Sequence, residues 1–108
     1  MYFMNWIYLI IAGIFEIGWP LGLKLSQNVQ YKFLGICMAI ICMATSGYFL
    51  WLAQKTIPMG TAYAVWTGIG AVGTLLVGII FLGDSANIWR LISASLIVFG
   101  IVGLKLAN

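Results

Sequence analysis

One acidic side chain lies inside an apolar stretch of this sequence. Glu16 is near the centre of residues 3–23, and no other charged residue lies near the centre of an apolar run. If this stretch crosses a membrane, its carboxylate costs about 2.5–3.5 kcal/mol on insertion scales, and such residues normally face a water-filled cavity or a partner. A structural ion pair is the alternative, but the sequence offers no cation at that depth. We therefore interpret Glu16 as a functional site.

The Glu16 carboxylate could hold two different ions in turn. Removal from water disfavours the ionised form, so protonation becomes accessible near neutral pH. Once ionised, the same group attracts a cation that can shed its water. A site that holds either a proton or a cation, but not both together, is the minimum requirement for an antiporter.

Aromatic and hydroxyl side chains extend the candidate site. Trp19 shares a helix face with Glu16, and Tyr63 and Trp66 share a face of a later run. Trp and Tyr offer a π-face to a cation and an N–H or O–H to a carboxylate. Ser46 adds a small hydroxyl in an otherwise apolar run. Alternatively, these aromatic side chains could serve only in packing or in a belt at the membrane interface. Trp19 and Trp66 lie inside their runs and not at the ends, which favours a role in the binding site.

Four long apolar runs position these residues. The chain has 108 residues, of which 64% are hydrophobic and 6% charged. This composition excludes a soluble, nucleic-acid-binding or disordered protein. Four spans of about 20 residues leave only short turns, and backbone groups in lipid must bond within their own segment. We expect an all-α integral membrane protein, one four-helix transmembrane domain over residues 1–108, with spans at about residues 3–23, 33–53, 61–82 and 88–104.

The residue inventory argues against enzyme chemistry. The chain has no His, and Cys37 and Cys42 have a spacing that fits neither a zinc site nor a bridge within one helix. We find no nucleophile and base pair and no cofactor motif. We therefore expect no catalytic residue, no metal and no cofactor, and we interpret both cysteines as small packing residues.

Glycines are concentrated in the apolar runs. In the third run, Gly68 and Gly70 are two helix-weakening residues within three positions. We hypothesise that they kink this span so that it bends between two states, with close helix packing as the alternative. Four spans can scarcely enclose a polar cavity alone, so we expect a homodimer in which two Glu16 residues share one site.

Four stretches resemble the small multidrug resistance family of bacterial inner-membrane transporters, and the resemblance covers essentially the whole chain. The matching stretches are residues 12–16, 22–24, 58–70 and 100–105. With Trp19 at this position the chain resembles the guanidinium-exporter branch of the family, because the drug-exporting branch has a smaller residue there. The resemblance implies proton-coupled export of guanidinium by an antiparallel, dual-topology homodimer in the bacterial inner membrane.

The same resemblance implies roles for individual residues. Glu16 would bind guanidinium and protons in turn, whereas Gly68 and Gly70 would kink the third span. The residues that would orient the substrate are Trp19, Ser46, Tyr63 and Trp66. Guanidinium fits this assignment, because it is planar and weakly hydrated and can bond a carboxylate bidentately, as an Arg does.

Pro20 departs from the family pattern, since the branch usually has Ala there. Proline lacks an N–H and so frees the carbonyl of Glu16, which could bend the first span or reshape the pocket beside Trp19. Three alternatives to guanidinium export stay open: efflux of quaternary ammonium or other lipophilic cations, a non-transporting membrane subunit, and one half of a heteromeric pair.

The positive side chains divide almost evenly between the two ends of the spans. Lys55 and Lys105 share one side of the membrane, and Lys24, Lys32 and Arg90 share the other. Orientation normally follows an excess of Lys and Arg on the cytoplasmic side. The near balance favours a chain that inserts in both orientations, and a fixed topology set by one residue is the alternative.

Reporter fusions at the carboxyl terminus test this topology. Dual insertion predicts activity from a cytoplasmic reporter and from an extracytoplasmic reporter on the same chain, because the charge bias is too small to fix one orientation. A signal from only one side of the membrane would rule out dual insertion.

Overall fold

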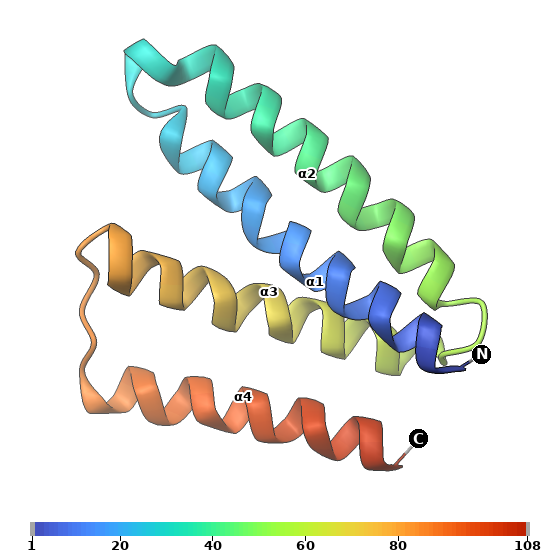
Figure 1. Cartoon of the computed structure of the whole chain (residues 1–108). Helices are drawn as coiled ribbons and strands as arrows, with labels where there is room; N and C mark the ends of the chain where they lie inside the picture. Colours follow the sequence, from blue (N-terminus) through green and yellow to red (C-terminus); the bar gives the residue numbers. More distant parts are fainter. Residues whose placement is uncertain (1, 108) are drawn as a thin grey trace.

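Four long helices form the structure, a computed structural model that describes residues 2–107 (Figure 1). They are α1 (Tyr2–Leu25), α2 (Lys32–Ala53), α3 (Met59–Phe81) and α4 (Ile88–Ala107), and the short 3₁₀ helix η1 (Val29–Tyr31) joins α1 to α2. All four long helices are long and apolar enough to cross a membrane. The expected all-α architecture with four candidate spans is therefore confirmed.

The helix ends differ from the predicted spans by a few residues. α1 continues through Lys24, and α4 continues through Lys105, where the sequence pattern predicted that the spans had already ended. Positive side chains in a last turn interact favourably with the carbonyl end of a helix, so they extend it rather than stop it. α3 begins at Met59 instead of residue 61, with Pro58 as its N-cap.

α1 is the central helix of the bundle. It packs along α2 on one side and crosses α3 on the other, whereas α4 lies mainly against α3 (Figure 1). The start of α1, the α2–α3 turn and the end of α4 lie at one end of the molecule, and the other two turns lie at the opposite end. There, Lys105 Nζ of α4 is 4.9 Å from the ring centroid of Trp6 of α1.

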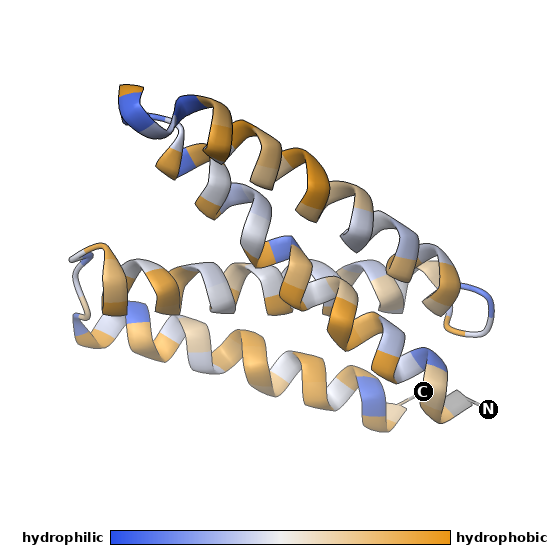
Figure 2. Cartoon of the chain, turned by 45° about the horizontal axis from the view of Figure 1, so that its top comes forward, coloured by the Kyte–Doolittle hydropathy of each residue, from blue (hydrophilic) through white to orange (hydrophobic). Residues whose placement is uncertain are grey.

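The buried core is small and lies near the end that carries the α2–α3 turn. Its members come from α1, α3 and the end of α2 with the following turn, namely Trp6, Leu9, Ala53, Ile57, Ala62 and Val65. Large apolar side chains elsewhere face outward, and Phe33 and Phe99 are 81% and 73% exposed. Figure 2 shows hydrophobic residues along all four helices and hydrophilic residues mainly at their ends. This outer surface suits a hydrocarbon solvent rather than water.

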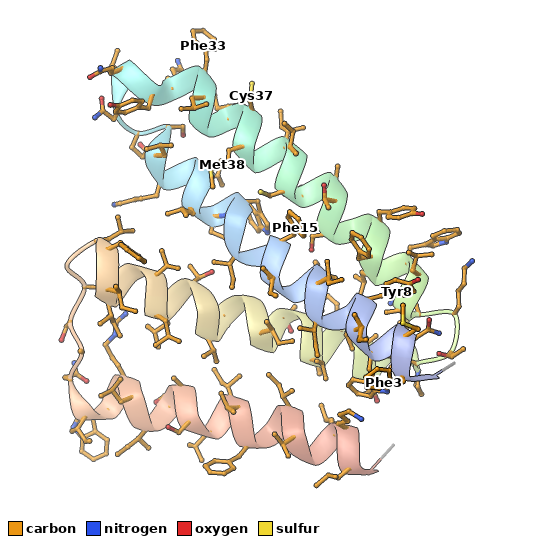
Figure 3. The ribbon with its side chains drawn as sticks, in the orientation of Figure 1. Phe3, Tyr8, Phe15, Phe33, Cys37 and Met38 are labelled. Carbon is orange, nitrogen blue, oxygen red and sulfur yellow. The ribbon has the colours of Figure 1, made fainter. Side chains whose placement is uncertain are left out.

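The two cysteines are free and occupy different environments. Cys37 is exposed on α2, on the side where Phe33 also projects (Figure 3). Cys42 is partly buried, and its Sγ would lie 2.5 Å from a Cβ added at Gly18 of α1. The packing role predicted for the cysteines therefore fits Cys42, whereas Cys37 faces the surroundings of the chain.

Backbone-to-backbone contact between α1 and α2 depends on two glycines. A Cβ added at Gly22 would lie 2.7 Å from the carbonyl oxygen of Gly35 and 2.8 Å from the backbone nitrogen of Ala39. A Cβ added at Gly35 would lie 2.5 Å from the carbonyl oxygen of Gly22. Small residues let membrane helices approach this closely, and a backbone neighbour cannot rotate away as a side chain can.

A Gly22→Ala substitution tests this contact. We expect it to lower the free energy of unfolding in detergent by about 1–3 kcal/mol, because the added methyl group forces α1 away from α2. Gly47→Ala on α2 is the matched control, since nothing lies within 4 Å of the added Cβ there. Equal stability of the two variants would contradict the close approach of α1 and α2.

Candidate functional site

Glu16 lies on the face of α1 that packs against α3, directly opposite Gly70. Its Cγ and Cβ would be 2.5 Å and 3.1 Å from a Cβ added at Gly70. The missing side chain of Gly70 therefore provides the space that the Glu16 side chain occupies. The sequence pattern predicted a different role for this glycine, and it did not indicate the contact.

The two glycines of the predicted kink face different neighbours. Gly70 faces Glu16 of α1, whereas a Cβ added at Gly68 would lie 2.9 Å from Cδ1 of Ile101 on α4. α3 is helical without interruption through both positions. In this structure the two glycines let α3 approach α1 and α4, and bending between two states stays a prediction.

Trp19 holds the carboxylate of Glu16. Its indole Nε1–H donates a hydrogen bond of 2.6 Å to Oε1 of Glu16, from one turn further along α1. Hydrogen bonds to a charged acceptor are short and strong, so this bond fixes one carboxylate oxygen. Among the described residues no other donor bonds this carboxylate, which leaves acceptor sites on both oxygens for a ligand.

A second hydrogen-bond network joins three helices beside Glu16. Trp66 Nε1–H of α3 donates to Ser46 Oγ of α2 at 2.8 Å, and Ser46 Oγ–H donates to the carbonyl oxygen of Ala12 on α1 at 2.6 Å. In an α-helix the carbonyl of Ala12 also accepts from the backbone N–H of Glu16. The fully buried Ser46 therefore connects the turn of α1 that carries Glu16 to both neighbouring helices.

Tyr63 belongs to this network only through Trp66. The two ring centroids are 5.5 Å apart with the planes tilted by 54°. The Tyr63 side chain is more than half exposed, and its hydroxyl forms no hydrogen bond within the described part of the chain. The structure thus brings the predicted site residues into two groups, Glu16 with Trp19 and Ser46 with Trp66 and Tyr63.

A cavity of about 500 Å³ opens beside Glu16. None of the other four predicted binding residues lines it. Its lining residues come from α1, α3, the α3–α4 turn and α4, and they are Glu16, Pro20, Thr67, Gly70, Ala71, Thr74, Leu75, Asp84 and Arg90. Thr67 shares the helical face that carries Tyr63 and Gly70 in the sequence, whereas Thr74, Asp84 and Arg90 were not predicted.

The sequence places Asp84 in the turn after the third apolar run and Arg90 near the start of the fourth, so neither was expected to reach Glu16. The sequence feature that could have indicated Arg90 is its position near the start of the fourth helix. From the first turn of α4, its long side chain can reach back along a neighbouring helix. Sequence spacing alone does not show which helix lies next to α4. The contribution of these two residues to the cavity therefore required the tertiary structure.

The fold and the site define a small multi-pass membrane protein with one membrane carboxylate beside an open cavity. Residues 4–97 match the sequence model of the family described as Small Multidrug Resistance protein. The chain belongs to the small multidrug resistance family, which confirms the resemblance found in its sequence.

Several relatives are about half identical to this chain. A protein of Proteus vulgaris is 51% identical over 105 residues, which cover 97% of this chain and the whole of that protein. A protein of Yersinia pseudotuberculosis is 50% identical over the same coverage. A protein of Escherichia coli K12 is 49% identical over 97% of this chain and 99% of its own. Each of the three is named guanidinium exporter.

A Ser46→Ala substitution tests the three-helix network. It removes the acceptor of the Trp66 indole N–H, and we expect the free energy of unfolding in detergent to fall by about 1–3 kcal/mol. The matched control is Thr45→Ala, because the Thr45 hydroxyl bonds the Ile41 carbonyl of its own helix and joins no other element. If the two variants unfold alike, the network does not hold the helices together.

Proposed function

We propose that this protein is a proton-coupled antiporter that exports guanidinium across the bacterial inner membrane. The observation that carries the proposal is the Glu16 carboxylate, which lies inside a membrane-spanning helix beside a cavity and has Trp19 as its partner instead of a fixed cation. The names of the relatives support guanidinium as the substrate. Protons and guanidinium compete for this one carboxylate.

The chemistry of guanidinium matches the acceptor that Glu16 offers. The ion is planar and weakly hydrated, and two of its N–H groups can bond one carboxylate side by side. The indole of Trp19 takes one acceptor site of Oε1 and orients the carboxylate for this contact. Quaternary ammonium ions cannot donate such bonds and would depend on aromatic walls. The geometry around Glu16 therefore favours a cation that donates hydrogen bonds.

The transport unit in this proposal is an antiparallel, dual-topology homodimer. Ala94 is the one buried residue among those of α4, and many large apolar side chains of α2 and α4 are exposed. A second copy would cover part of this surface and close the open cavity beside Glu16. The near-even distribution of Lys and Arg allows the two copies to insert in opposite orientations.

Alternating access follows from competition at the shared site. Protons arriving from outside neutralise the Glu16 carboxylates, and the dimer then rearranges toward the cytoplasm. Release of the protons exposes the carboxylates to guanidinium, which is carried outward as the dimer returns. Each ligand shifts the populations of two states of the dimer, and bending of α3 at Gly68 and Gly70 contributes to the change. Trp19, Ser46, Tyr63 and Trp66 shape the site in both states.

Electrical recordings on purified protein in liposomes test this function. We expect guanidinium to drive currents coupled to protons, tetramethylammonium to drive little current, and Glu16→Gln to abolish coupled exchange, because glutamine can neither release a proton nor carry the charge that attracts the cation. Thr45→Ala is the control that retains the currents.

Three results would contradict the proposal. Robust exchange of tetramethylammonium without guanidinium exchange would assign the protein to drug efflux. Unchanged activity of Glu16→Gln would point instead to a non-transporting subunit. Currents that require a second, different chain would indicate a heteromeric pair.

A further inference from the structure

Two charged residues near the ends of the apolar runs share the cavity with Glu16. Asp84 lies in the α3–α4 turn and Arg90 in the first turn of α4, and both line the cavity of about 500 Å³. Thr67 and Thr74 of α3 line the same cavity. Because Glu16 is near the middle of α1 and Asp84 is beyond the end of α3, this cavity leads from the membrane carboxylate to the end of the bundle.

The Asp84 carboxylate folds back over the end of α3. Gly83 has a left-handed φ of 74°, and the backbone N–H of Asp84 then donates to the carbonyl oxygen of Gly78 at 3.0 Å. Oδ2 of Asp84 is the atom closest to the position of a Cβ at Gly78. The carboxylate therefore occupies the space left by this glycine. A neighbouring cavity of about 220 Å³ is lined by both Asp84 and Lys24, so this acid shares one cavity with Arg90 and another with Lys24.

Arg90 brings a guanidinium group of the chain into the same cavity. Its backbone N–H donates to Oδ1 of Asn87 at 3.0 Å, which fixes the first turn of α4. Its Nε is buried and has no hydrogen-bond partner among the described residues, and neither Asp84 nor Glu16 forms an ion pair with it there. A buried donor without a partner is destabilising, which favours a second arrangement in which Arg90 bonds a carboxylate.

We propose that Asp84 and Arg90 form a charged mouth through which guanidinium reaches Glu16, an inference that rests on the proposed function. Asp84 is the first binding point for the cation. In the second arrangement, Arg90 is a tethered guanidinium that pairs with Asp84 and competes there with the substrate. An arriving guanidinium exchanges one guanidinium–carboxylate pair for an equivalent pair, so the mouth binds the substrate without trapping it. Asp84 thus affects how readily guanidinium reaches the cavity, whereas Glu16 binds the guanidinium and protons that are transported.

Kinetics of guanidinium exchange in liposomes separate these roles. We expect Asp84→Asn to raise KM for guanidinium by about threefold to tenfold and to keep the saturated rate within about twofold, as the loss of one partly solvated charge pair predicts. Raising the ionic strength from about 0.02 M to about 0.5 M should shrink this effect by screening. Asp84→Glu keeps the charge and should restore KM, which distinguishes a binding role from a folding defect.

A double-variant cycle tests the competition between Arg90 and the substrate. Arg90→Gln should lower KM while Asp84 is present, and this decrease should be lost in the variant that combines Arg90→Gln with Asp84→Asn. Lys32→Gln is the control, because Lys32 lies at the same end of the bundle but lines neither cavity. We expect this control to leave KM unchanged.

The outcomes that overturn the inference differ from those that overturn the function. An unchanged KM in Asp84→Asn, a salt-independent change, or an Arg90→Gln effect that persists without Asp84 would each overturn the charged mouth while the parent protein still exchanges guanidinium for protons. A parent protein that carries no guanidinium would overturn the proposed function and this inference with it.

Discussion

A carboxylate in the middle of a membrane helix is stable only if the protein supplies it with donors and space. The structure meets this requirement for Glu16 with few residues. Trp19 donates to one carboxylate oxygen from the same helix, and Gly70 leaves room on the facing helix. Glu16 also lines a cavity, and no cation among the described residues forms an ion pair with its carboxylate. The position of α1 between α2 and α3 follows from the same requirement, because both neighbours must bring polar or small groups to this one turn.

Two kinds of helix contact surround that turn. α1 meets α2 through backbone at Gly22 and Gly35, which leaves little freedom for sliding. α1 meets α3 through the buried core at one end, and near Glu16 through the Glu16 side chain beside an open cavity. The buried hydroxyl of Ser46 joins the three helices at the level of Glu16. A close backbone contact on one side and a cavity beside Glu16 on the other suit the proposed binding and release of small ions at this carboxylate.

Membership of the small multidrug resistance family and the geometry of Glu16 support each other. The relatives named guanidinium exporter match nearly the whole chain at about half identity. The site independently offers a carboxylate with free acceptor positions, which suits a cation rich in N–H donors. Pro20 lines the cavity beside Glu16, so the departure from the family pattern lies where it can influence substrate contacts.

Hydropathy alone determined the number of helices and singled out Glu16, because charge is expensive in lipid and its place in an apolar run is visible in the sequence. The sequence also indicated Trp19, since helical spacing relates neighbours within one helix. It did not determine which residues of different helices meet. In lipid an apolar side chain can face either a neighbouring helix or the solvent, so periodicity does not identify the inner face. Only the tertiary structure placed Gly70 against Glu16, joined Trp66 to Ser46, and brought Asp84 and Arg90 to the cavity.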